Sequence, residues 1–110
     1  MNRRIKCIIT AITGDRIVIG NAELQHAIDE HFQLLPEDML LELIERILKD
    51  PTDIYLEKAK QIYHLFYKLD NNRYLVVVVK KSETGNYFST IYPTGKTIRN
   101  KHKKLKKVKI

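Results

Sequence analysis

The eight residues RYLVVVVK, at positions 73–80, constrain the fold more than any other part of the sequence. Four consecutive valines follow Tyr74 and Leu75, so an extended chain would be apolar on both sides. β-Branched side chains favour strands, and a strand that is apolar on both sides must be covered on both faces of its sheet. The sequence therefore predicts a central strand here, with other parts of the chain packed on each face.

Shorter segments around this strand predict the rest of an antiparallel sheet. Residues 61–69 (QIYHLFYKL) alternate in polarity and end at the turn sequence DNN. Residues 87–92 (YFSTIY) return after the turn sequence SETGN, and Pro93 is expected to end the sheet. Residues 54–60 (IYLEKAK) are a candidate short strand.

The first half of the chain predicts a β-hairpin and two helices. Residues 4–12 and 16–19 read as strands joined by a Gly-Asp turn. Asn21 is expected to cap a helix over residues 22–31. A second helix is indicated from Pro36 to about Asp50, because apolar residues recur there at three- and four-residue spacing. We therefore predict one α+β domain over residues 1–95, in which the N-terminal β-hairpin and two helices pack on a three- to four-stranded antiparallel sheet.

Charge is distributed very unevenly along the chain. Residues 1–95 contain 12 Lys or Arg and 13 Asp or Glu, whereas residues 96–110 contain eight Lys or Arg and no acid. Such a basic C-terminal tail suits a polyanion such as a nucleic acid, because phosphate contacts release counterions. The alternatives are a solubilising tail, or one that lies on the protein's own acidic surface, since residues 21–57 carry ten acids and two bases. The candidate RNA-binding residues of the tail are Lys96, Arg99, Lys101, Lys103, Lys104, Lys106, Lys107 and Lys109.

Composition excludes several other classes of protein. No apolar run approaches the ~20 residues that a transmembrane helix needs. Cys7 is the only cysteine, so neither an internal disulfide nor a four-cysteine zinc site can form. We expect a protein of the reducing cytoplasm that uses no cofactor.

Histidines are the residues best suited to chemistry at neutral pH. His26 and His31 lie five residues apart, which separates them by about 140° on a helix and argues against a shared metal. His31 is expected at the helix end, where the helix dipole favours its protonated form, and His26 is expected to point into a cleft against the sheet. The alternative is that His26 is a partly buried packing residue and His31 a C-terminal cap. His64 is expected to be an ordinary surface or sheet-edge residue, and His102 part of the charged tail.

Polar residues also follow the apolar strand. Lys80 ends this strand, and the next strand carries Ser89, Thr90 and Tyr92. Hydroxyl groups in a core strand are costly unless they are used, and a cation with hydroxyls would suit a phosphate. Strict alternation places Thr90 and Tyr92 on one face with Phe88, and Ser89 on the other. The alternative is an ordinary solvent-facing side of the sheet.

Taken in order, the segments LQHAIDEHF, ILKDPTDIY, YLVVVVKK and YFSTIYPT resemble the phage and toxin-type branch of the barnase, EndoU, colicin and RelE-like endoribonuclease superfamily. The resemblance covers residues 5–95. It implies N-terminal helices on a four-stranded antiparallel sheet and RNA cleavage without a metal. The sequence departs from the pattern in having Phe32 where a proline often follows the second histidine.

Carried over by position, the resemblance implies a catalytic set at the two helix histidines, the strand lysine and the Thr-x-Tyr element, with further contacts to RNA. The catalytic candidates are His26, His31, Lys80, Thr90 and Tyr92, and Arg73 and Ser89 are additional RNA contacts. A histidine would act as base or acid on the ribose 2′-hydroxyl or the leaving oxygen, and the cation would stabilise the phosphorane. The expected partners are RNA and a neutralising antitoxin protein. Two alternatives stay open: a non-catalytic nucleic-acid-binding protein that uses its tail, and a protein-interaction module.

Overall fold

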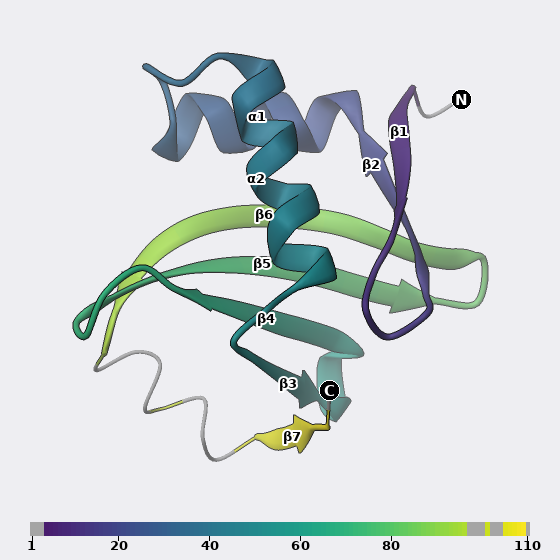
Figure 1. Ribbon diagram of the computed structural model, residues 1–110. Helices are drawn as coiled ribbons and strands as arrows, with labels where there is room; N and C mark the ends of the chain where they lie inside the picture. The colour runs from purple at the N-terminus through teal and green to yellow at the C-terminus, as the bar shows by residue number, and fades with distance from the viewer. Residues whose placement is uncertain (1–3, 97–100, 102–104, 110) are drawn as a thin grey trace.

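The computed structural model describes residues 4–96, 101 and 105–109. Two helices pack beside a seven-stranded sheet with the order β1-β2-β6-β5-β4-β3-β7 in this part of the chain, which confirms the α+β class (Figure 1). The prediction of three to four strands was too low. In chain order the elements are β1 (Ile5–Thr10), β2 (Arg16–Gly20), α1 (Asn21–His31), α2 (Glu37–Lys49), β3 (Asp53–Glu57), the 3-10 turn η1 (Lys58–Lys60), β4 (Ile62–Lys68), β5 (Arg73–Ser82), β6 (Gly85–Gly95) and β7 (Lys106–Val108).

The valine-rich strand β5 is central, as predicted. It pairs antiparallel with β4 on one side and with β6 on the other. Val76 and Val77 are both completely buried although they point to opposite faces. Both faces of the sheet are therefore covered at its centre, as an uninterrupted run of β-branched residues requires.

The extra strands come from pairings between distant parts of the chain. The β1–β2 hairpin joins the sheet because β2 pairs in parallel with β6, at Ile17–Asn86 and Val18–Tyr87. At the opposite edge β7 pairs antiparallel with β3. Each contact is only two or three residue pairs long, so neither leaves a periodic signal in the sequence.

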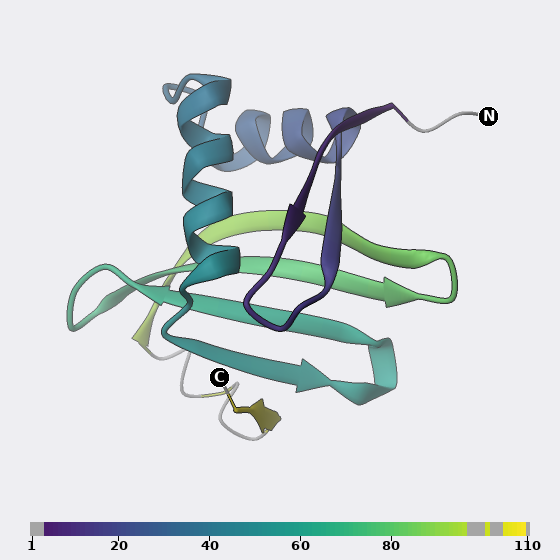
Figure 2. The same cartoon turned by 45° about the vertical axis from the view of Figure 1, so that its right-hand side comes forward.

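Both helices lie on the same face of the sheet. α1 runs alongside β6, and α2 crosses the sheet above β5 and β4 (Figures 1 and 2). α2 has the predicted apolar stripe, with Leu40, Ile44 and Ile47 completely buried against the strands. Two predicted helix starts were wrong by one residue, since Gly20 rather than Asn21 is the N-cap of α1, and Pro36 is the N-cap of α2 rather than its first residue.

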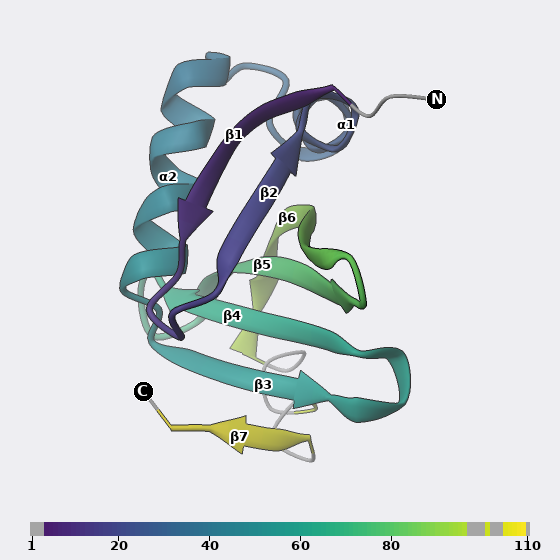
Figure 3. The ribbon, with the colours of Figure 1, turned by 90° about the vertical axis from the view of Figure 1, so that its right-hand side faces the viewer.

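The other face of the sheet carries a second, aromatic cluster. Tyr55, Phe66, Tyr74, Val76 and Val78 form it, and Leu105 from the C-terminal segment packs against it. No helix of the described residues contributes to this cluster. Figure 3 shows β7 lying beyond β3, at the edge of the sheet far from the β1–β2 hairpin.

A β-bulge in β6 changes which residues share a face. The register moves from Val78–Thr90 to Val79–Phe88, so Ser89 is the extra residue. Strict alternation was therefore wrong for this strand. Phe88 and Ile91 both enter the helix-covered core, whereas the register places Thr90 and Tyr92 on the opposite face.

Pro93 lies inside β6 rather than ending the sheet, and it pairs with Leu75. Among the described strands, β6 pairs only with β5 in this part, because its contact with β2 is confined to Asn86 and Tyr87. A proline is tolerated at such a free edge because its missing N–H is not required by a second neighbour.

Candidate functional site

The two helix histidines meet on one carboxylate. His26 Nε2 lies 3.0 Å from Glu30 Oε1, and His31 Nε2 lies 3.7 Å from Glu30 Oε2. The i,i+4 spacing places His26 and Glu30 on one face of α1, while His31 reaches the second oxygen from the next position. The angle between the two histidines therefore does not keep their imidazoles from sharing a partner.

His26 is more exposed than the sequence suggested. Its side chain is 64% exposed, so it is neither a packing residue nor directed into a cleft against the sheet. Leu24 and Ala27 supply the buried face of α1 instead. His31 is the last residue of α1 and its side chain is 35% exposed, while the C-cap position belongs to Phe32.

His31 also contacts the sheet. Its ring centroid lies 6.3 Å from that of Tyr92 on β6, with the ring planes tilted by 47°. Burial raises the pKa of the Tyr92 phenol. The hydroxyl is therefore protonated throughout the neutral range and can donate a hydrogen bond to an anion. The fold thus brings together His31 and Tyr92, two residues that were predicted to act together.

A cavity of about 540 Å³ opens beside His31. It is formed by the end of α1 and the loop that leads to α2, and Leu34 in this loop is fully exposed. The cavity gives the imidazole access to a ligand from solvent. Its lining residues are Glu30, His31, Phe32, Gln33, Leu34 and Leu35.

Lys80 does not join the histidines. Thr90 and Tyr92 lie opposite Val78 and Val76, and Lys80 is two residues beyond Val78 on the same strand face. The Tyr92 position and Lys80 are four residue steps apart along β5, or about 13 Å of strand. Lys80 lines a different cavity, of about 420 Å³, that shares no residue with the cavity beside His31.

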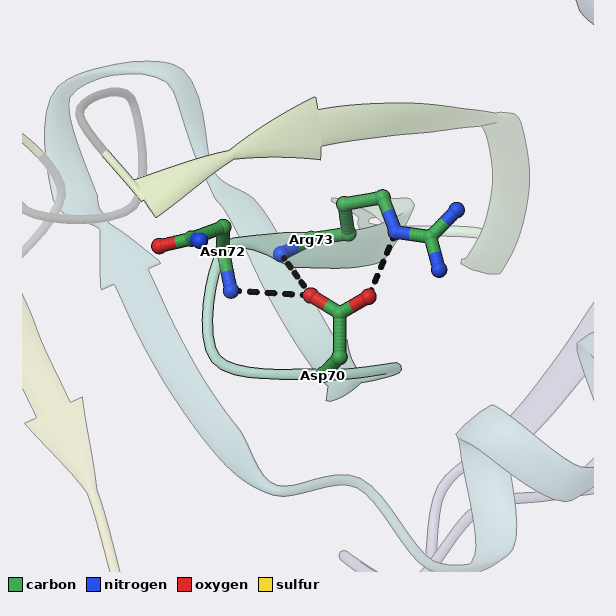
Figure 4. Close-up of polar contacts among 3 residues, drawn as sticks. All are labelled: Asp70, Asn72 and Arg73. Carbon is green, nitrogen blue, oxygen red and sulfur yellow. Dashed lines mark hydrogen bonds and ion pairs between the residues drawn. The ribbon is translucent and has the colours of Figure 1, made fainter.

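Arg73 lies at the other end of β5, where it closes the β4–β5 turn. Its Nε donates to Asp70 Oδ2 at 2.6 Å, and Asp70 Oδ1 accepts the backbone N–H groups of Asn72 and Arg73 (Figure 4). The backbone hydrogen bond from Asn72, followed by the Arg73 side chain, lowers the pKa of Asp70. The Arg73 side chain is 74% exposed, so its guanidinium remains accessible from solvent. Ser89, the extra residue of the bulge, is exposed.

The tail residues fall into different environments. Lys107 lies 3.2 Å from the buried carboxylate of Asp53, so this lysine contacts the protein's own acidic surface. Lys96, Lys101, Lys106 and Lys109 are exposed, and the backbone N–H of Lys96 donates to Asn72. Three candidate RNA-binding residues, Arg99, Lys103 and Lys104, lie outside the described residues, as does His102.

The sequence missed a second histidine–carboxylate pair. His64 was expected at the surface or at a sheet edge, but β4 is an interior strand and the His64 side chain is only 11% exposed. Its Nε2 lies 3.3 Å from Glu57 Oε1. Desolvation acts to raise the pKa of Glu57, but the hydrogen bonds from His64 and Lys60 outweigh it and lower that pKa. No local sequence pattern predicts this pair, because the two residues meet only when β3 and β4 pair on either side of the turn η1.

Glu30 was also missed, although its spacing was a usable signal. It stands four residues after His26 and directly before His31. Among the residues that the structure describes, no group of three His, Cys, Asp or Glu side chains is arranged to hold a metal ion. Nor is any helix in that part of the chain long and apolar enough to cross a membrane.

Comparison with known proteins places these features in a family. The family model described as "phage-Barnase-EndoU-ColicinE5/D-RelE like nuclease2" matches residues 2–109, which includes β7 and most of the basic tail. No curated protein and no solved structure gives a significant match. The chain therefore belongs to the phage-type branch of the barnase, EndoU, colicin E5/D and RelE-like nucleases.

Proposed function

We propose that this nuclease-family protein is a metal-independent endoribonuclease that uses the 2′-hydroxyl of its substrate as the nucleophile. The observation that carries the proposal is the junction at the end of α1. There, one carboxylate holds two accessible imidazoles, and one of these contacts a tyrosine on β6. Imidazoles titrate near neutral pH, so they are suited to both halves of an acid–base reaction.

Each of these side chains has a distinct role in the proposed reaction. One imidazole removes the 2′-hydroxyl proton as the oxygen attacks phosphorus, and the other, as imidazolium, protonates the departing 5′-oxygen. Glu30 contacts both histidines through Nε2, so their Nδ1 atoms are the ones that exchange protons with RNA. Its negative charge also stabilises whichever ring is protonated. The products are a 2′,3′-cyclic phosphate and a 5′-hydroxyl.

Neighbouring side chains bind the RNA in this proposal. The protonated Tyr92 donates to a phosphate oxygen, and Thr90, on the same strand face, offers a second hydroxyl. The cavity beside His31 receives a base. Because Lys80 lies about 13 Å of strand from the Tyr92 position, it contacts a different phosphate from the scissile one. Arg73 and Lys96 contact the RNA strand near the end of β5 that lies opposite Lys80.

Product analysis tests the reaction directly. The protein is incubated with RNA in EDTA, and the fragment ends are identified by phosphatase and cyclic-phosphate hydrolysis. We expect 2′,3′-cyclic phosphate ends, no cleavage of DNA, and no cleavage of RNA that carries 2′-O-methyl groups throughout. Cleavage of 2′-O-methyl RNA, or complete dependence on added Mg²⁺, would refute the mechanism.

The same experiment separates the proposal from its competitors. Uncontrolled RNA cleavage harms a cell, so such an activity fits a toxin that a partner protein neutralises. Binding to RNA without cleavage would instead identify a nucleic-acid-binding protein that acts through its exposed tail lysines. Absence of any interaction with RNA would leave the protein-interaction module as the remaining hypothesis.

A further inference from the structure

We propose that the end of the β5–β6 hairpin is a second phosphate subsite, formed by Lys80, Ser82, Thr84 and Tyr87, which binds a backbone phosphate away from the cleavage point. This inference rests on the proposed function in that its ligand is the same RNA strand. It assigns phosphate binding to the hydroxyl groups of Ser82, Thr84 and Tyr87. It also places Lys80 in a site separate from the histidines at the end of α1. It does not require cleavage to occur.

The hairpin brings these residues into one cavity. Lys80 and Tyr87 are directly paired across β5 and β6, and Ser82 is two residues further along the face of Lys80. The cavity measures about 420 Å³ and is completed by Ile5 at the start of β1. No ion pair links Lys80 to another described residue, and the acidic turn residue Glu83 does not line the cavity. The positive charge of Lys80 is therefore available to an anion.

The three hydroxyls form a connected chain beside this charge. Ser82 Oγ donates to the carbonyl of Gly85 at 3.1 Å and lies 3.0 Å from Thr84 Oγ1. Thr84 Oγ1 lies 2.9 Å from the Tyr87 hydroxyl. Either atom of that last pair can be the donor. When Ser82 donates to Thr84 instead of to Gly85 and Thr84 donates to Tyr87, the phenol O–H can donate to a phosphate oxygen next to the lysine.

The position of the cavity formed by Lys80 and Tyr87 fits an extended RNA strand bound along α1. α1 begins at Asn21, whose backbone N–H donates to Arg4, adjacent to the cavity residue Ile5. It ends at His31 beside the other cavity, and its 11 residues span about 16 Å. The two cavities thus lie near opposite ends of the helix, so one RNA strand would contact them through different nucleotides.

Binding of a non-cleavable RNA tests the subsite independently of catalysis. The probe is a random-sequence octamer with 2′-O-methyl groups throughout, titrated into the full chain by fluorescence anisotropy at several salt concentrations. We expect Lys80→Ala to weaken binding about tenfold and to reduce the slope of log affinity against log salt by about 0.7, the value for one contact to a single strand. Tyr87→Phe is expected to weaken binding about threefold. Lys49→Ala, on α2, is the matched control and should bind as wild type does.

Amide chemical shifts provide the second readout. The probe is expected to shift the signals of residues 80–87 in the wild type and not in Lys80→Ala. Equal affinity of wild type and Lys80→Ala would overturn the subsite, as would a loss with Lys80→Ala that is accompanied by no effect of Tyr87→Phe and no shifts in the hairpin. If these binding effects occur in a protein that cleaves no RNA, the subsite stands and the proposed nuclease reaction falls.

Discussion

The two histidine–carboxylate groups of this protein share their chemistry but differ in their surroundings. His26 and His31 meet Glu30 at the end of α1, with side chains 64% and 35% exposed. His64 meets Glu57 within the sheet, where its side chain is 11% exposed. The first group borders a cavity of about 540 Å³, and the second lies on the sheet face that holds the aromatic cluster.

This difference separates a candidate for catalysis from a structural pair. An RNA strand can reach the imidazoles at the helix end, whereas the side chain of His64 is only 11% exposed. Buried polar groups stabilise a fold only when they are hydrogen-bonded, and the Glu57 contact provides such a bond for Nε2 of His64. Residue type alone therefore assigns neither role, and accessibility decides between them.

Removing the buried histidine should have the largest effect on stability. His64→Ala leaves a cavity and deprives Glu57 of one of its two partners, so we expect a loss of about 1–3 kcal/mol in the free energy of unfolding. His26→Ala, at an exposed position, should change it by less than about 0.5 kcal/mol. Urea unfolding followed by circular dichroism measures both. If the two variants were equally stable, the distinction between the groups would be lost.

Neutralising the shared carboxylate should lower activity without unfolding the protein. Glu30→Gln removes the charge that stabilises the imidazolium, and we expect RNA cleavage to slow by about tenfold, equivalent to about 1.4 kcal/mol. Glu45→Gln is the matched control, because Glu45 forms an i,i+4 pair with Lys49 on the other helix. A Glu30 variant as active as the Glu45 variant would show that the carboxylate does not assist the histidines.

The His64–Glu57 pair in the sheet should make the stability of the protein depend on pH. Because the pKa of Glu57 is lowered in the folded protein, its contribution to stability is present above its ordinary pKa of 4.5 and is lost as the pH falls through the folded value. Glu57→Gln should therefore be less stable than wild type at pH 7 and equal to it under strongly acidic conditions. Unfolding curves at both pH values test this, and a difference that persists or grows in acid would contradict it.

The tail lysines should give the smallest individual effects. Lys106 and Lys109 are exposed, so the double alanine variant is expected to reduce the slope of log RNA affinity against log salt by about 1.4, from about 0.7 for each contact to a single strand, with little sequence preference. Point variants are preferable to truncation, because truncation would also remove β7. An unchanged slope in anisotropy titrations would exclude these lysines from the interface.

Local patterns predicted the elements whose burial is periodic. The valine run of β5 and the apolar stripe of α2 specify their own secondary structure, since each must bury a particular set of side chains. The resemblance to the nuclease family was confirmed on the same segments. Contacts made across the fold had no such signal. The parallel pairing of β2 with β6, the short strand β7 and the bulge at Ser89 all depend on distant partners.

The candidate site was predictable in part for the same reason. Its histidines stand out because they are few, and His31 does contact Tyr92 as their joint selection implied. The angle of about 140° between the histidines on the helix does not predict their shared partner, whereas the i,i+4 spacing of His26 and Glu30 does. Lys80 was grouped with them through the family resemblance, as the residue expected to close the apolar strand. In the structure β5 continues to Ser82, and strand register keeps Lys80 about 13 Å from the Tyr92 position.

The rate of RNA cleavage by His31→Ala and His64→Gln, measured side by side in EDTA, tests the central claim most directly. If the helix-end histidine is catalytic, His31→Ala should lose about 100- to 10,000-fold in rate while it stays folded, and His64→Gln should keep most of the wild-type rate at a temperature where it is folded. A fully active His31→Ala protein, or a loss confined to His64→Gln, would contradict the account.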